Sequence, residues 1–197
     1  MKTRMLISIF ILVLVVLIIT SSCATTPKTK EEREGVQPEV FFQSVKSGDY
    51  AEVKRLIKKG ANVNAQDNFG YTALMWASRK GHTEVTKLLI EQGADVEAQD
   101  NEGWTALMHA TGLEQADVAK LLIEQGADVN AQDNRRARNT ALIRASVHGH
   151  PEVIKLLLEA GADVNFQDKY GYTALKWASR YGHTDIVELL REAGAKE

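Results

Sequence analysis

Three histidines are the first residues of this 197-residue sequence that could hold a metal ion or move a proton. His82, His150 and His183 each follow a glycine, at equivalent places in a recurring pattern. Zinc needs its ligand nitrogens at about 2.0–2.1 Å, whereas neighbouring helices pack about 8–10 Å apart. Equivalent histidines of stacked units therefore lie too far apart to share an ion. We expect each imidazole to bridge its turn to the neighbouring unit, and we expect no metal site.

Four aspartates could act as acids or bases if they converged on one pocket. Asp67, Asp100, Asp133 and Asp168 each open a turn-like segment, where an aspartate side chain accepts hydrogen bonds from its own backbone. We therefore expect them to form turns. The sequence has no nucleophile-elbow pattern and no phosphate-binding glycine loop. It predicts no catalytic residue and no cofactor, and only a pocket of convergent, perturbed groups would favour an enzyme.

These residues belong to a repeat with a period near 33 residues. The segment that starts at Asp67 returns after 33, 33 and 35 residues. A fixed period in this range indicates a solenoid, in which each unit packs only on its neighbours. Within a unit we expect two helices. A threonine before an Ala-Leu pair is predicted to cap the first helix, and a left-handed glycine to end the second. The threonines and glycines are Thr72, Thr105, Thr140, Thr173 and Gly93, Gly126, Gly161, Gly194.

Residues 39–197 resemble the ankyrin-repeat family. The resemblance rests on the Gly-x-Thr-Ala-Leu turn, the Gly-His break and the Leu-Leu…Gly-Ala-Asp-Val end, which recur together. It implies an all-α solenoid of stacked helix-turn-helix units with short β-hairpin or turn tips. Met75, Met108, Ile143 and Lys176 replace the family histidine, so we expect looser turns. We expect five repeats, with polar side chains capping both ends: 39–67, 68–100, 101–133, 134–168 and 169–197.

The first 22 residues are predicted to be a secretory signal peptide. Two basic side chains and no acid precede a fourteen-residue apolar run, Leu6–Ile19. As a helix this run would span about 21 Å, which is less than the ~30 Å hydrocarbon core of a membrane. The alternative is an uncleaved signal anchor.

The single cysteine follows this run. Residues 19–24, Ile-Thr-Ser-Ser-Cys-Ala, resemble the lipobox of bacterial lipoproteins, although Thr20 stands where that family has leucine. The resemblance implies cleavage before Cys23, acylation of its thiol and a stable membrane anchor. Ala24 in place of aspartate favours the outer membrane. Residues 23–38 are polar and are predicted to form a disordered tether.

The charge balance restricts the class of partner. A net charge of −2 argues against nucleic acid, whose binding domains are strongly basic. In the ankyrin architecture the loop tips and first helices form a concave inner face, and the second helices form the outer face. The outer positions are mostly acidic, whereas basic and aromatic residues gather on the inner ones. We expect the partner to contact Phe69, Tyr71, Arg79, Lys80, Trp104, Arg135, Arg136, Arg138, Arg144, Tyr170, Tyr172 and Arg180.

The sequence thus predicts a monomeric, lipid-anchored, protein-binding scaffold of a bacterial cell envelope, whose partner carries an acidic patch. Aromatic and arginine side chains dominate the energetics of protein interfaces, which favours the inner face as the contact. Two alternatives stay open. The chain could inhibit or protect one periplasmic enzyme, or it could bind anionic envelope polymers.

Overall fold

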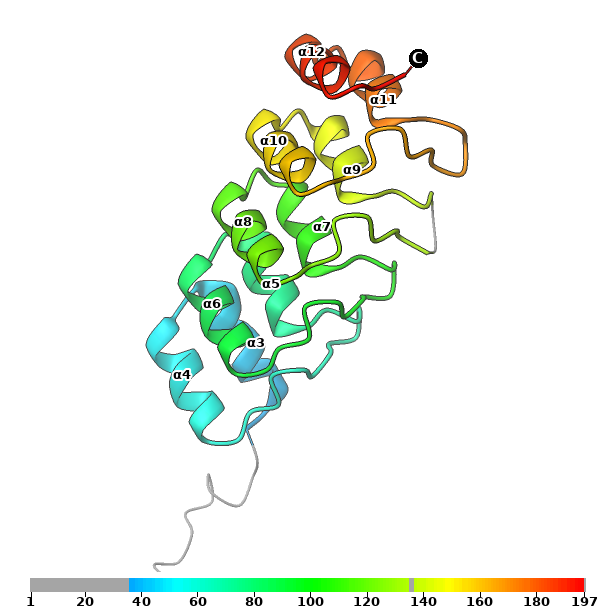
Figure 1. Cartoon of the computed structure of the whole chain (residues 1–197). Coiled ribbons are helices and arrows are strands. Elements are labelled where there is room, and N and C mark those ends of the chain that lie inside the picture. Colours follow the sequence, from blue (N-terminus) through cyan, green and yellow to red (C-terminus); the bar gives the residue numbers. More distant parts are fainter. Residues whose placement is uncertain (1–35, 135–136, 197) are drawn as a thin grey trace, which may run out of the picture. The chain divides into compact units, whose positions relative to one another are not determined.

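The computed structural model describes residues 36–134 and 137–196 (Figure 1). These residues form ten helices in five consecutive pairs. The predicted tether was to reach residue 38, but the first helix already begins at Pro38, and Val36 packs against the core. The pairs are α3 (Pro38–Ser47) with α4 (Tyr50–Lys58), α5 (Ala73–Lys80) with α6 (Thr83–Glu91), α7 (Ala106–Thr111) with α8 (Ala116–Glu124), α9 (Ala141–His148) with α10 (Pro151–Glu159), and α11 (Ala174–Tyr181) with α12 (Thr184–Glu192).

Local capping fixes where the helices start and end. Each of the four predicted threonines accepts a hydrogen bond from the backbone N–H three residues later, at 3.3–3.4 Å. This bond satisfies one of the N–H groups that a helix leaves unpaired at its start. The four predicted glycines after the second helices all have positive φ. Both predictions are confirmed.

The helices lie in two rows. The first helices form one row, the second helices form the other, and the loops between pairs project beyond the first row (Figure 1). Each of the three inner first helices packs between two neighbours in the row, as α5 does between α3 and α7. The core lies between the rows. It includes one fully buried leucine from every second helix after α4, each contributing about 1.5–3 kcal/mol to stability: Leu89, Leu122, Leu157 and Leu190.

Asparagine side chains join successive repeats on the outside. The Asn64 Oδ1 atom accepts from the N–H of Asp95 at 2.9 Å, and its Nδ2 donates to the Gly93 carbonyl at 3.0 Å. Asn130 and Asn165 make the same pair of bonds one repeat further on. Each asparagine side chain thus pairs a backbone carbonyl and a backbone N–H group at the end of the following repeat.

One link in this series is different. Glu97 occupies the equivalent position in the loop between α6 and α7, and its Oε1 accepts from the N–H of Asp128 at 2.9 Å. A carboxylate has no N–H group, so it cannot donate to the Gly126 carbonyl as the asparagines do to theirs.

The expected loosening of the turns is not seen at the first of them. Met75 replaces the family histidine, yet its sulfur accepts from the N–H of Thr72 at 3.3 Å. The threonine caps hold at all four turns, because they need only the hydroxyl and a backbone N–H. The only β-bridge among the described residues joins Gln66 to Thr72, so the tips are turns with minimal hairpin character.

The third repeat departs most from the others. Glu114 has φ +56° at the place where the neighbouring repeats have Gly81, Gly149 and Gly182. A non-glycine residue in this left-handed region costs about 1–2 kcal/mol. The helix before it, α7, is correspondingly the shortest, and it ends at Thr111.

The two ends of the stack carry polar side chains. Arg55 is exposed and pairs with Glu52 on α4, and Lys176 and Arg191 are exposed on the last repeat. No helix within residues 36–134 and 137–196 is long and apolar enough to cross a membrane.

Candidate functional site

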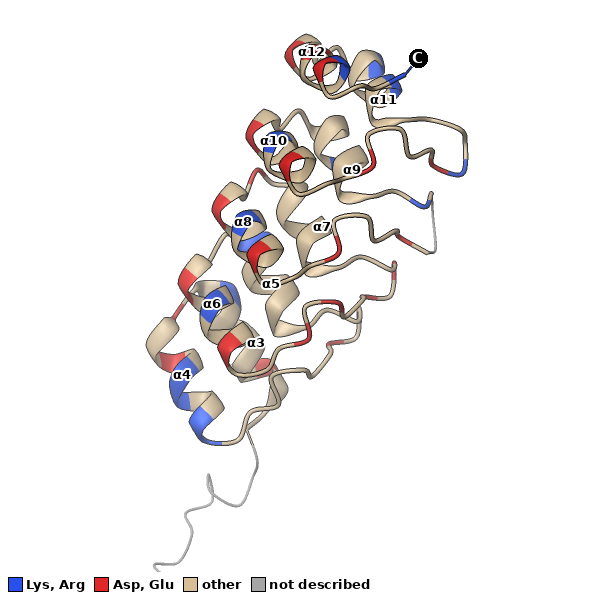
Figure 2. Cartoon of the chain, viewed as in Figure 1, with Lys and Arg blue, Asp and Glu red and all other residues tan. Residues whose placement is uncertain are grey.

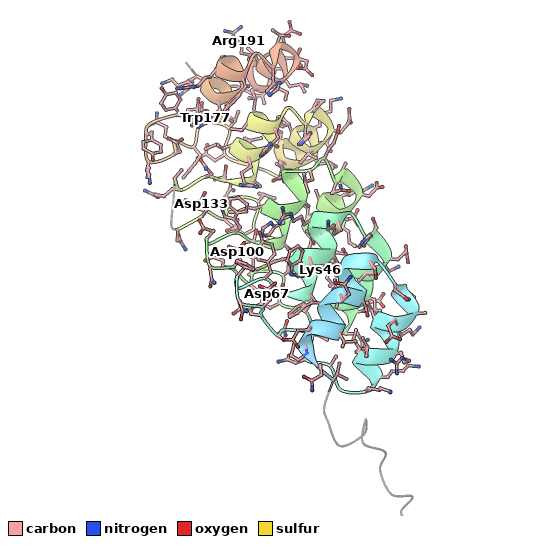
Figure 3. All side chains as sticks on the ribbon, turned by 180° about the vertical axis from the view of Figure 1, so that it is seen from behind. Lys46, Asp67, Asp100, Asp133, Trp177 and Arg191 are labelled. Carbon is pink, nitrogen blue, oxygen red and sulfur yellow. The ribbon has the colours of Figure 1, made fainter. Side chains whose placement is uncertain are left out.

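The inter-repeat aspartates organise the inner face, which we define as the first helices and the loop tips. Oδ1 of Asp67 accepts from the N–H groups of Phe69 and Tyr71 at 2.9 and 3.0 Å. Asp100, Asp133 and Asp168 hold their own loops in the same way, which confirms their predicted role as turn formers. Figure 3 shows the first three along one side of the stack.

The second oxygen of three of these carboxylates reaches a first helix, whereas Oδ2 of Asp133 accepts from the N–H of Asn139 in its own loop at 3.1 Å. Oδ2 of Asp67 accepts from the indole N–H of Trp76 at 2.9 Å, and Asp168 does the same with Trp177. These two aspartates therefore tie their loops both to the loop backbone and to the helix that follows. An anchored loop presents its side chains in a fixed geometry, which lowers the entropy lost on binding.

Two matching clusters stand on this scaffold, in the second and the last repeat. In the first cluster the Arg79 guanidinium donates to the Tyr71 hydroxyl at 3.4 Å and lies 5.7 Å from the Trp76 ring centroid. Lys46 from the preceding repeat covers the same indole at 3.9 Å.

The second cluster repeats this geometry 101 residues later. Arg180 donates to the Tyr172 hydroxyl at 3.4 Å and lies 5.7 Å from the Trp177 ring centroid. Both arginines are exposed. Each cluster is a cation held beside two aromatic rings, a combination that is enriched in protein interfaces.

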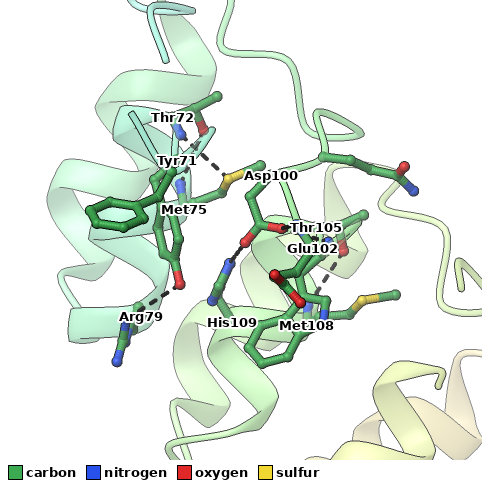
Figure 4. A network of polar contacts seen from close by, with 12 residues as sticks. Tyr71, Thr72, Met75, Arg79, Asp100, Glu102, Thr105, Met108 and His109 are labelled. Atoms are coloured by element: carbon green, nitrogen blue, oxygen red, sulfur yellow. Dashed lines mark hydrogen bonds and ion pairs between the residues drawn. The ribbon is translucent and has the colours of Figure 1, made fainter. Parts of the chain in front are cut away.

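Between the clusters lies a buried hydrogen bond between a histidine and an aspartate, drawn in Figure 4. His109 takes the place of Trp76, and its Nε2 lies 2.8 Å from Oδ2 of Asp100, with 2% and 1% of the two side chains exposed. The imidazole also packs on the rings of Tyr71 and Trp104, at 4.6 and 5.3 Å between centroids.

Burial and hydrogen bonding set the protonation of this pair. Desolvation lowers the pKa of His109, against the opposing effect of Asp100, so the imidazole is neutral at pH 7. The pKa of Asp100 is also lowered: desolvation would raise it, but the bonds from His109 and from the backbone outweigh that effect. A carboxylate only accepts, so Nε2 of His109 carries the hydrogen. The pair is sealed from solvent and cannot reach a substrate.

Arg144 occupies the same helix position in the fourth repeat and is largely buried. Its guanidinium lies 3.6 Å from the Trp104 ring centroid, and its Nε donates to the Met108 carbonyl at 3.2 Å. Burial lowers its pKa to about 10, which leaves it charged at pH 7. Gly112 makes room for it, since a Cβ there would lie 2.9 Å from the Nη2 atom of Arg144. This arginine therefore joins two repeats.

The predicted contact residues thus divide by exposure. Phe69 and Tyr170 stand at loop tips with 70% and 64% of their surface exposed, and Lys80 is exposed at the end of α5. Trp104 and Arg144 are mostly covered by each other and by their neighbours.

The lengthened loop between α8 and α9, which leads into the fourth repeat, is described only in part. Arg138 is exposed, has φ +58° at a position where other loops have glycine, and donates to Oε1 of Gln132 from Nε and Nη2. Arg135, Arg136 and Cys23 lie outside the described residues.

The histidines after the first helices are structural. Nε2 of His82 and of His183 lies 3.1 and 3.2 Å from the carbonyls of Lys46 and Val147 in the preceding repeat, as predicted. His150 differs, because its ring faces Glu114 at 3.8 Å. Among the described residues, no three side chains of the metal-binding types lie close enough to hold an ion.

Charge is distributed as the sequence pattern indicated. Acidic side chains recur along α6, α8, α10 and α12, and each of these helices carries a single basic residue, a lysine in the first three and Arg191 in α12 (Figure 2). The exposed arginines Arg79 and Arg180 lie on the first helices instead. On the inner face, Arg79, Arg144 and Arg180 thus each lie beside an aromatic ring.

Comparison with known families agrees with this geometry. The family described as Ankyrin repeats (3 copies) matches residues 41–133 and 134–197. The chain belongs to the ankyrin-repeat family. No curated protein matches it. Ankyrin repeats generally mediate protein–protein interaction, and proteins built from them are typically non-enzymatic binding modules.

Sequence reasoning missed two features of this ankyrin stack. The Asp100–His109 pair and the Arg144–Gly112 fit both depend on side chains that meet across a loop or between repeats. Aligning the repeats in columns provides the signal, because Trp76, His109, Arg144 and Trp177 fall at one position. A polar residue at a position otherwise held by tryptophan is a candidate for a special contact.

Proposed function

We propose that the protein is a lipid-anchored binding module of a bacterial cell envelope, which captures a protein partner through its inner face. The observation that supports this most is the pair of matching tyrosine–tryptophan–arginine clusters. Both present an exposed guanidinium on the same row of helices, three repeats apart. A carboxylate of the partner at each cluster would accept paired, charge-assisted hydrogen bonds from arginine.

The partner that suits this face carries an acidic patch at least three repeats long. Exposed ion pairs add little energy alone, typically below about 1 kcal/mol. The aromatic rings beside each arginine supply apolar contact area, and Phe69 and Tyr170 extend it at the loop tips. Rigid loops and caps reduce the ordering cost when the partner binds.

Attachment to the envelope is the second part of the proposal. Its support is the sequence of residues 1–24, a basic start, an apolar run and a lipobox-like end at Cys23. Two or more acyl chains give stable anchoring, whereas one gives only marginal binding. The polar residues between Cys23 and the folded part, which begins at Val36, would then act as a tether between the bilayer and the repeats. We propose the outer membrane as the site of the anchor.

Crosslinking capture from native membranes tests the binding proposal. The mature protein is used as bait, beside a variant in which Arg79 and Arg180 are replaced by alanine. One dominant protein band that the variant loses supports the proposal. Capture of anionic glycan in place of protein, abolished by moderate salt, would overturn it in favour of polymer binding. The proposal would also be contradicted if the wild-type bait captured no protein in larger amount than the variant bait does.

A further inference from the structure

The last repeat carries an open groove on the face where a further repeat would stack. It measures about 550 Å³ and is lined by Tyr172, Leu175, Lys176, Ser179, Arg180 and Arg191. This volume is within the usual range of ligand sites, about 300–1,000 Å³. Five of these residues belong to α11 or the turn before it, and Arg191 comes from α12, above Trp177 in Figure 3.

In the inner repeats the surface equivalent to this groove is covered by the repeat that follows. Ser179 is exposed, whereas Ser78, Thr111 and Ser146 at the equivalent position are fully buried by the next repeat. Likewise Lys176 is exposed where Met75, Met108 and Ile143 are buried. The backbone of α11 therefore retains a shape made to receive another chain segment.

The side chains on this surface favour one charge of occupant. Lys176, Arg180 and Arg191 are cations, and no acid lines the groove. Solubility of an end repeat requires only polar side chains of either sign. The acids of α12, Asp185, Glu188 and Glu192, are not among the residues that line the groove.

The floor of the groove is apolar. Leu175 is 3% exposed, and Tyr172 is partly buried beside Trp177 at 5.0 Å between ring centroids.

A second copy of this chain does not suit the groove. Docked by the same face, it would set the cations of the two grooves against each other, which would cost several kcal/mol.

We infer that this groove binds an acidic segment of a protein partner, with one apolar side chain against Leu175 and Tyr172 and carboxylates beside Lys176 and Arg180. This inference rests on the proposed function, since Tyr172 and Arg180 also belong to the inner face. A partner that lies along the inner face can continue around the end of the stack into the groove.

The test uses residues 23–197 and a fluorescent twelve-residue peptide of aspartate and glutamate with one central leucine. Binding is followed by fluorescence anisotropy, and the site is mapped by amide NMR shifts. We expect the shifts to centre on Leu175 and Ser179. Lys176→Glu is expected to weaken binding about ten-fold, whereas the matched outer-face variant Lys120→Glu leaves it within two-fold. Replacing the peptide leucine by serine is expected to weaken binding as well.

Three results would overturn the inference. The peptide fails to bind at millimolar concentration, its shifts centre on another surface, or both lysine variants weaken it equally. Binding of vesicles with one quarter anionic phospholipid in a Lys176-dependent manner, without peptide binding, would assign the groove to lipid instead. The Lys176→Glu protein can also be compared with the double variant that carries Arg79→Ala and Arg180→Ala. If the Lys176→Glu protein still binds a native partner that the double variant does not bind, the groove inference fails and the proposed function stands.

Discussion

His109 donates a hydrogen bond to Asp100 at 2.8 Å, where Trp76 and Trp177 donate to the equivalent aspartates at 2.9 Å. The three bonds do the same structural work, since each ties a loop to the following first helix. They differ in one property. An indole N–H does not titrate near neutral pH, whereas an imidazole does.

The first prediction is a stability that falls in mild acid, with His109 as one source of the fall beside His148, whose pKa burial also lowers. The folded pKa of His109 is below its ordinary value of 6.5, so the unfolded chain binds its proton first. Below about pH 6.5 the free energy of unfolding therefore falls as pH falls, until the folded pKa is reached. Loss of stability from Asp100, whose pKa is also lowered, follows as pH falls through its own folded pKa.

Urea unfolding of wild type and His109→Gln between pH 7.5 and 5 measures this effect. The glutamine amide can donate to Asp100 and does not titrate, so we expect its stability profile to be flatter over that range. Circular dichroism at pH 7.5 serves as the control that the variant is folded. Parallel profiles for the two proteins would show that His109 is not the source of the slope.

The second prediction concerns the left-handed residue of the third repeat. Glu114→Gly removes the strain of a side chain at φ +56° and is expected to stabilise the protein by about 1 kcal/mol. The Glu114–His150 contact that it removes is 3.8 Å long, and the Glu114 side chain is 58% exposed, so its loss costs little. Thermal unfolding provides the measurement. Glu84→Gly, in the first turn of α6, is the matched control and is expected to destabilise by about 0.5–1 kcal/mol. A lower melting temperature for Glu114→Gly would contradict the strain argument.

The third prediction completes the outer series of asparagines. Glu97→Asn supplies the missing N–H toward the Gly126 carbonyl while keeping an oxygen for Asp128. One hydrogen bond contributes about 0.5–1.5 kcal/mol, and this site is exposed, so we expect a gain at the lower end. Asn130→Asp, which makes the reverse change one repeat later, is expected to lose a similar amount. Denaturant midpoints that move the same way in both variants would rule out this role for the amide.

The sequence predicted those features that each repeat contains within itself. The caps at Thr72 and its equivalents, the glycine ends and the aspartate turns depend on residues a few positions apart, and their spacing is visible in one unit. The buried position of Arg144 could not be predicted from the spacing within one repeat. It depends on Gly112, an absent side chain in the preceding repeat, and on the face of Trp104. Whether an arginine is exposed or buried is a property of two repeats together.

The fourth prediction tests attachment to the membrane. Intact mass of the protein purified from membranes should correspond to a chain that begins at an acylated Cys23. Cys23→Ala is expected to leave the membrane fraction, since the thiol that carries the lipid is gone. An unmodified Met1 in the wild-type protein, or a membrane fraction unchanged by Cys23→Ala, would contradict the lipoprotein proposal.

The central claim is that the inner face binds a protein. The most direct measurement is calorimetric titration of the captured partner with three proteins. These are the wild type, a double variant that carries Arg79→Ala and Arg180→Ala, and a double variant that carries Lys87→Ala and Lys120→Ala. Both double variants remove two cations, the first pair from the inner face and the second from the outer face. We predict that the inner-face pair weakens the Kd by about ten-fold or more, while the outer-face pair changes it by less than two-fold. Equal losses from the two faces, or a greater loss from the outer one, would contradict the claim.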